Sequence, residues 1–205
     1  MAKKKHLKSE KKAMLKFLSA RALAIDAYAS VEQRLVALYA QLMKVPLDYA
    51  GITFFRLNNA RARNAIITTL IKKRHGEKFN LFANALFKEL GSLDEERNHI
   101  VHWGILPVVN AQGRIKRIKL TPPNYWNRNE HTPKKSVEEM YAFSKRCRFF
   151  VKALEMLWYV ASGLKPDERL HQMKNRCLPC LPQESDAPGS SMLGGCLVQR
   201  FLAYC

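Results

Sequence analysis

The chain has few acidic residues for its size. Among its 205 residues, 17 Asp and Glu stand against 35 Lys and Arg, which gives a formal net charge of +18. So strong an imbalance favours a polyanionic partner such as nucleic acid or anionic lipid. The alternative is a basic protein whose surface binds no specific polyanion.

No long hydrophobic run is present in the sequence. The most apolar stretch, residues 149–163, is interrupted by Lys152 and Glu155 and is too short to cross a bilayer. The first residues, MAKKKHLKSEKK, have the charge of a signal peptide but lack the apolar segment that would follow it. We therefore expect a cytoplasmic protein that does not bind membranes.

Cysteine is scarce and unevenly placed. Four of the five cysteines fall in the last thirty residues, and an odd number does not suit a secreted disulfide scaffold. Cys177 and Cys180 form a CxxC pair, but they lie in a Pro-rich stretch and lack further ligands at the spacing of a zinc site. The sequence also lacks a Walker-type phosphate loop, a Rossmann glycine fingerprint and a GxSxG elbow. We expect no metal and no other cofactor.

Helical periodicity covers most of the chain. Over residues 13–44, two apolar series are offset near Ser30, which predicts either one long helix or two shorter ones. The first series is Leu15, Leu18, Ala22, Ile25 and Ala29, and the second is Val31, Leu35, Leu38 and Leu42. A helix over 53–74 would bury Phe55, Ile66, Ile67, Leu70 and Ile71, and one over 77–90 would bury Phe79, Phe82 and Leu86.

Turn and cap residues divide the rest of the sequence. Gly91 is expected to end one helix, and the capping box from Ser92 to Glu95 to open a short helix over 93–103. Residues 105–120 predict a β-hairpin. A second capping box, from Ser136 to Glu139, opens a helix to about residue 162 with a stripe of Met140, Cys147, Val151, Leu154 and Trp158.

The predicted fold is mainly all-α, an up-and-down helical bundle of four to five helices with a small β-hairpin insertion. We expect a mobile basic arm over residues 1–12, a helical domain over 13–163 and a flexible Pro/Gly/Ser-rich tail over 164–205. The arm belongs to a stretch, residues 1–16, that holds seven lysines and one glutamate.

One arginine of the short helix occupies an unusual position. On an ideal helix, Arg97 falls within the apolar stripe formed by its neighbours Leu93, Ile100 and Val101. A guanidinium there is costly to desolvate unless carboxylates, carbonyls or a ligand phosphate satisfy its donors. Asn98 and His102 share a second face. His99 falls on a third face and is expected to be solvated.

The segment ERNHIVHWG, residues 96–104, resembles the signature of the HEPN superfamily, in which an arginine and a polar residue precede a histidine by four to six intervening positions. The segment FFRLNNARARNAII, residues 54–67, is similar to the helix before this motif in some bacterial HEPN-like proteins. The chain departs from the pattern at Trp103, where many members have glycine, and in the inserted hairpin.

The resemblance implies metal-independent cleavage of RNA. It also suggests that the protein is a toxin or defence effector, for which an antitoxin protein would be a partner. His102 would act as general acid or base, Arg97 would neutralise charge on the phosphoryl oxygens, and Asn98 would orient His102 or the substrate. An ideal helix separates Arg97 from His102 by about 140°, and the resemblance implies a homodimer that pairs two motifs. The alternatives are a noncatalytic RNA- or DNA-binding module and a dimeric structural or interaction protein.

Two clusters of cations could follow a phosphate backbone. The first is a four-cation strand: Arg114, Lys116, Arg117 and Lys119. The second lies on the predicted helix over 53–74: Arg56, Arg61, Arg63, Lys72, Lys73 and Arg74. Tyr125 and Trp126 could stack on bases. In the alternative interpretation both aromatics cover the core and the cations are simply solvated.

Overall fold

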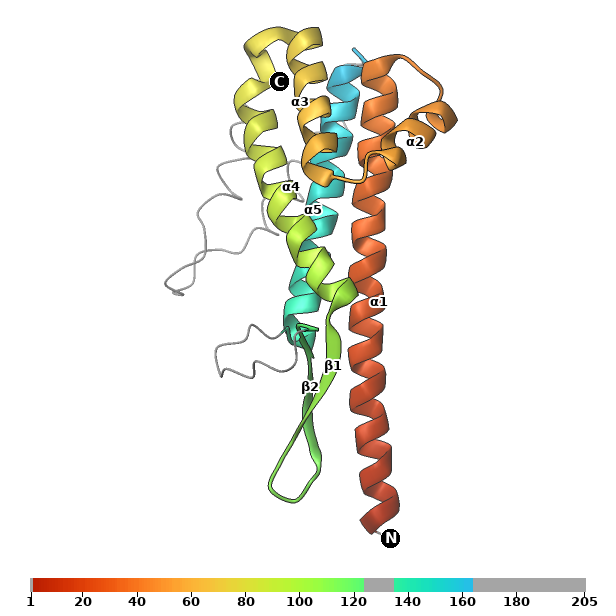
Figure 1. Ribbon diagram of the computed structural model, residues 1–205, viewed down its shortest axis with the longest axis vertical. Helices are drawn as coiled ribbons and strands as arrows, with labels where there is room; N and C mark the ends of the chain where they lie inside the picture. The colour runs from red at the N-terminus through yellow and green to blue at the C-terminus, as the bar shows by residue number, and fades with distance from the viewer. Residues whose placement is uncertain (1, 124–134, 164–205) are drawn as a thin grey trace, which may run out of the picture. The chain divides into compact units, whose positions relative to one another are not determined.

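The structure is a computed structural model that describes residues 2–123 and 135–163, with side chains from residue 10 onward (Figure 1). Its elements are α1 (Ala2–Met43), α2 (Leu47–Arg56), α3 (Ala60–His75), the 3₁₀ helix η1 (Gly76–Phe79), α4 (Asn80–His102), β1 (Gly104–Val109), β2 (Ile115–Thr121) and α5 (Val137–Ala161). The predicted mainly helical fold with a small hairpin is confirmed.

The chain divides into two compact units. The first unit contains residues 2–33 of α1 and 92–151, which include the end of α4, the hairpin and the beginning of α5. The second unit contains residues 34–91 and 152–163 of the described chain. The predicted domain boundaries at residues 12 and 163 stay predictions.

α1 is one uninterrupted helix, and it includes the residues that we expected to form a mobile arm. In the first unit it buries a stripe at spacings of three and four: Phe17, Ala20, Ala24, Tyr28 and Val31. The prediction of Leu15, Leu18, Ala22, Ile25 and Ala29 as the core series is wrong, because the three large side chains of that series are exposed, as is Ala22, and Ala29 is half-exposed. The second predicted series is buried and continues the observed stripe.

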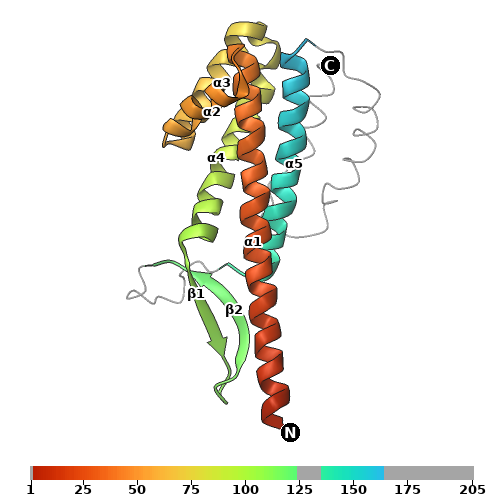
Figure 2. The ribbon, with the colours of Figure 1, turned by 90° about the vertical axis from the view of Figure 1, so that its right-hand side faces the viewer.

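The hairpin follows α4 directly. β1 and β2 are antiparallel, with Ile105 opposite Leu120 and Pro107 opposite Ile118. Asn110 closes the turn, since its side-chain oxygen accepts hydrogen bonds from the backbone N–H groups of Gln112 and Arg114. Gly113 adopts a φ of 71°, a conformation that glycine accepts without steric cost. The predicted hairpin is confirmed, and Figure 2 shows it alongside the N-terminal part of α1.

α5 begins at the predicted capping box. The N–H of Ser136 donates to Glu139 Oε2 at 2.6 Å, and the N–H of Glu139 donates to Ser136 Oγ at 3.2 Å. Within the first unit, Met140, Phe143 and Cys147 of α5 are buried. The predicted stripe is confirmed at Met140, Cys147 and Leu154, whereas Val151 and Trp158 are only half-buried.

In the second unit, the helix predicted over 53–74 is in fact two helices, α2 and α3. The chain leaves helical geometry at Leu57, and Asn59 caps α3 by accepting a hydrogen bond from the N–H of Arg61 at 2.8 Å. Ile67 and Ile71 are buried as predicted, but Phe55 is exposed and its neighbour Phe54 is buried instead, against Tyr39.

α4 is also continuous where we predicted a break. Gly91 and Ser92 lie inside the helix, so the expected cap at Ser92 does not form. The apolar spacing continues through this point, with Leu86, Leu90, Leu93 and Ile100 all buried. Burial of that stripe outweighs the local stop signal, since a glycine costs an exposed helix only about 1 kcal/mol.

Candidate functional site

Arg97 lies at the position of α4 where its apolar stripe would continue, and its side chain is half-buried. The guanidinium carbon lies 5.6 Å from the centre of the Tyr28 ring, in cation–π geometry. Nη1 donates a hydrogen bond to Asn98 Oδ1 at 3.0 Å. The Tyr28 hydroxyl in turn donates to Asp94 Oδ1 at 2.5 Å. An aromatic face and an amide oxygen therefore provide part of the stabilisation that the sequence predicted this guanidinium to need.

His102 is the last residue of α4, and its side chain is exposed together with that of Asn98. The two are four residues apart and so share one face of the helix. Among the described residues, no side-chain hydrogen bond engages the His102 imidazole. Asn98 is thus a link between the Arg97 guanidinium and the surface that carries His102.

Arg21 of α1 fixes the end of the helix that carries these groups. Its Nε donates to the carbonyl oxygen of Ile100 at 2.9 Å, and its Nη2 donates to those of Val101 at 2.7 Å and Trp103 at 3.2 Å. The last turn of a helix has carbonyls without intrahelical partners, and a cation is favourable there. No sequence pattern predicted this contact, because the acceptors are backbone atoms about eighty residues away.

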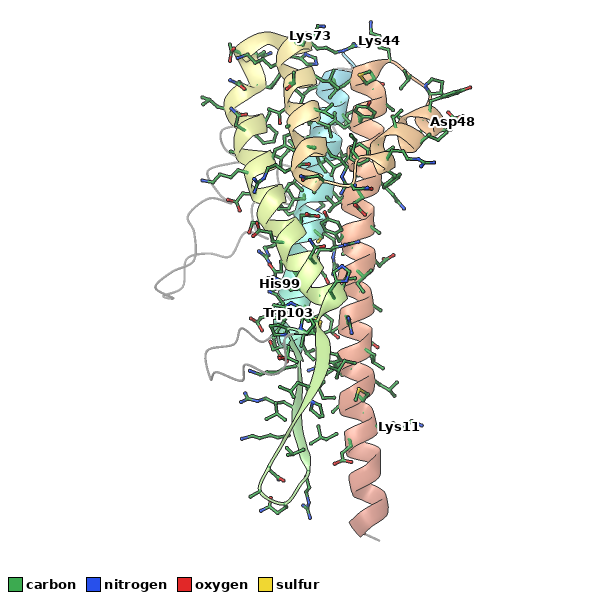
Figure 3. The ribbon with its side chains drawn as sticks, viewed as in Figure 1. Lys11, Lys44, Asp48, Lys73, His99 and Trp103 are labelled. Atoms are coloured by element: carbon green, nitrogen blue, oxygen red, sulfur yellow. The ribbon has the colours of Figure 1, made fainter. Side chains whose placement is uncertain are left out.

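His99 does not have the solvated position that we predicted. It is half-buried, and its ring stacks on Trp103 with the ring centres 4.3 Å apart (Figure 3). Trp103 is itself buried, and its backbone N–H donates to the carbonyl oxygen of His99 at 3.0 Å. Trp103, the departure from the HEPN pattern, therefore has a packing role at the junction of helix and hairpin.

Glu96 is a second charged residue that the sequence did not single out. It forms ion pairs with Lys135, at 2.8 Å, and with Arg146 of α5. Burial opposes ionisation of this carboxyl, but the hydrogen bonds and charges of the two cations outweigh it and hold the pKa of Glu96 below its ordinary value. This ion triad of Glu96, Lys135 and Arg146 connects α4 to the residues just before α5 and to the first half of α5.

Cys147 is buried in the core of the first unit. Burial raises the pKa of its thiol to about 12, so that the thiol is neutral at physiological pH. A neutral, buried thiol is a poor nucleophile. We therefore assign Cys147 to the core and not to the site.

The two cation clusters belong to different units. The hairpin cations Arg114, Lys116 and Arg117 are exposed and Lys119 is half-exposed, in the same unit as Arg97, Asn98 and His102. The other cluster belongs to the second unit and is partly engaged: Lys72 pairs with Glu77 at 2.8 Å, and Arg63 lies over the Phe54 ring at 5.1 Å. Arg56, Arg61, Lys73 and Arg74 are exposed.

Tyr125, Trp126 and the CxxC pair lie outside the described residues. Within the part of the chain that the structure describes, no group of three or more His, Cys, Asp or Glu side chains is placed to hold a metal ion. None of the described helices has the length and apolar character of a membrane span. No protein-family model, curated protein or solved structure matches the chain.

Proposed function

We propose that the protein is a metal-independent endoribonuclease that uses Arg97, Asn98 and His102 and binds RNA through the hairpin cations. The observation that carries this proposal is the exposed imidazole of His102 beside Asn98, in one compact unit with the four-cation strand. Within the part of the chain that the structure describes, no side-chain hydrogen bond engages this imidazole. Histidine is the side chain that most often acts as a general acid or base, and the exposure of His102 leaves it available to a substrate. The resemblance of residues 96–104 to the HEPN signature supplies the reaction class.

In the proposed reaction, His102 takes the proton of a ribose 2′-hydroxyl while the 2′-oxygen bonds to the adjacent phosphorus. The bond from phosphorus to the 5′-oxygen breaks, and that oxygen leaves with a proton from a general acid. The products are a 2′,3′-cyclic phosphate and a 5′-hydroxyl end. Arg97 stabilises charge on the non-bridging oxygens, because its planar fork suits phosphate geometry.

The roles assigned to Arg97 and His102 are completed by a second copy of the chain. The two residues are five positions apart on one helix, about 140° around its axis, and Arg97 is turned toward Tyr28 while His102 is exposed. We propose that a dimer supplies the second motif, and that a cytoplasmic antitoxin protein is a further partner.

The test is cleavage of RNA by the purified protein in EDTA, comparing wild type with His102→Ala. We expect fragments with 2′,3′-cyclic phosphate ends from the wild type, and a loss of rate of about a hundredfold or more in the variant, the usual scale of a general acid or base. His99→Gln is the matched control, because its ring packs on Trp103. Equal cleavage by wild type and His102→Ala would refute the proposed role of His102.

A noncatalytic RNA-binding module is the second candidate. It is favoured by the hydrogen bond between Arg97 and Asn98 and by the contact of Arg97 with Tyr28, since these contacts suit a structural arginine. On this hypothesis the wild type binds RNA but cleaves none of several RNA classes. Arg97→Ala then lowers the melting temperature, whereas His102→Ala leaves both binding and stability unchanged.

A further inference from the structure

The outer side of α1 in the first unit carries a second apolar stripe. Leu15, Leu18 and Ile25 are 54%, 44% and 39% exposed, and Ala22 between them is exposed as well. Their spacing of three, four and three residues is that of a coiled-coil seam. The stripe lies about 140° around the helix from the buried series that begins at Phe17. α1 therefore presents one apolar face to its own unit and another to solvent.

We infer that this outer stripe, defined by Leu15, Leu18, Ala22 and Ile25, is the contact surface for a second copy of the chain, with the two α1 helices antiparallel. A single exposed leucine is ordinary on a protein surface. An aligned series with seam spacing, on a helix whose core-facing positions are already filled, is better explained by a partner helix. The inference rests on α1 alone and does not depend on the proposed ribonuclease activity.

The distribution of charge along α1 favours a second copy of the chain as the partner and an antiparallel arrangement of the two helices. The N-terminal part of α1 is rich in lysine, with seven lysines in residues 1–16, whereas acidic Asp26 and Glu32 lie beyond the stripe toward its C-terminal end. A parallel pair would place the two lysine-rich ends side by side. An antiparallel pair places the lysine-rich end of each helix beside Asp26 and Glu32 of the other, and such a contact is isologous and closes as a dimer.

The spacing also fixes a register. When Leu15 of one helix faces Ile25 of its partner, Leu18 faces Ala22, so each layer of the seam is apolar. In that register the exposed Lys12 flanks the exposed Asp26 of the other copy. Ser19 is exposed beside the stripe, halfway along its length. In this register it lies near Ser19 of the other copy, across the two-fold axis.

The test is sedimentation of full-length protein, freed of nucleic acid, at concentrations up to about 1 mM and in about 0.3 M salt to screen the net charge. We expect a monomer–dimer equilibrium, weak because the seam is short. Leu18→Glu should weaken dimerisation at least about a hundredfold, because it buries a carboxylate in the seam. Leu23→Glu is the matched control, since Leu23 is 50% exposed on the same helix but lies outside the stripe.

Two further variants test the direction of the helices. Lys12→Glu and Asp26→Lys should each weaken the dimer about three- to tenfold, and the double variant should restore it. Ser19→Cys should cross-link to itself with a short bifunctional maleimide, as identified by peptide mapping. A monomer at every concentration, equal weakening by Leu18→Glu and Leu23→Glu, or failure of the double variant to restore the dimer would overturn the inference.

Discussion

The Arg21 guanidinium donates hydrogen bonds to carbonyl oxygens at the end of α4, which the last turn leaves without helical partners. The side chain therefore positions the residue that follows, His102, although it lies in a different helix. Its fork geometry matters as much as its charge, because Nε and Nη2 reach different carbonyls. A lysine keeps the charge but offers a single point of contact.

We expect Arg21→Lys to lower the free energy of unfolding by about 1–2 kcal/mol, the scale of lost hydrogen bonds to a charged group. The measurement is urea denaturation followed by circular dichroism. Arg34→Lys on the same helix is the control, because Arg34 makes a 3.5 Å surface pair with Glu155 and its replacement should change stability by less than about 0.5 kcal/mol. A loss in Arg21→Lys no larger than in the control would contradict the anchoring role.

Glu96 makes stability depend on pH. Its pKa is lower in the folded chain than its ordinary value near 4.5, so its ionised form favours folding above that pH, and this contribution is lost as the pH falls through the folded pKa. Glu96→Gln should reduce the free energy of unfolding by about 2 kcal/mol at pH 7. In thermal melts, the difference from wild type should be smaller at pH 3 than at pH 7.

The control for this pH dependence is Glu95→Gln, since Glu95 is exposed on the same turn of α4. It should stay within about 0.5 kcal/mol of the wild type at both pH values. If Glu96→Gln and wild type differ as much at low pH as at pH 7, the ion triad with Lys135 and Arg146 does not stabilise the fold through its charge.

At the scale of single elements, the hairpin and the start of α5 were predictable because their signals are local. Asn110 closes its turn, and Ser136 and Glu139 cap their helix, through contacts within four residues. Local chemistry was a poor guide at Ser92, where packing of Leu90 and Leu93 keeps the helix intact. It also could not decide which of two apolar faces of α1 belongs to the core, since both have helical spacing.

The hairpin is expected to contribute a specific share of RNA binding. Replacing Arg114, Lys116 and Arg117 by glutamine removes up to three phosphate contacts. The slope of log binding constant against log salt should then fall by about 2, at roughly 0.7 per contact for single-stranded RNA. Fluorescence anisotropy with a labelled RNA across a salt series measures the slope.

The charge-matched control replaces Arg56, Lys73 and Arg74, three exposed cations of the second unit. It should leave the slope closer to that of the wild type. Equal losses in the two triple variants would mean that RNA responds to net charge alone and that the hairpin is not a distinct binding element.

At the scale of the whole molecule, the net charge of +18 was the clearest property of the sequence, and it names a class of partner but no reaction. The face of α4 that holds Arg97 followed from helical geometry. Its partners did not, because Tyr28 and Asp94 are brought to it by the packing of α1 against α4. The exposure of His102 and the anchoring by Arg21 likewise depend on tertiary contacts that no local pattern encodes.

The uninterrupted passage of α4 through Gly91 and Ser92 has a consequence for its dynamics. A β-carbon added at Gly91 would meet no atom within 4 Å, so packing does not require glycine there. Because glycine stabilises a helix less than other residues do, opening the helix costs least at this turn. A break there creates a new helix N-terminus that Ser92 and Glu95 can cap. Transient breaks in α4 should therefore concentrate between Gly91 and Ser92, where the exposed helix end can be capped locally.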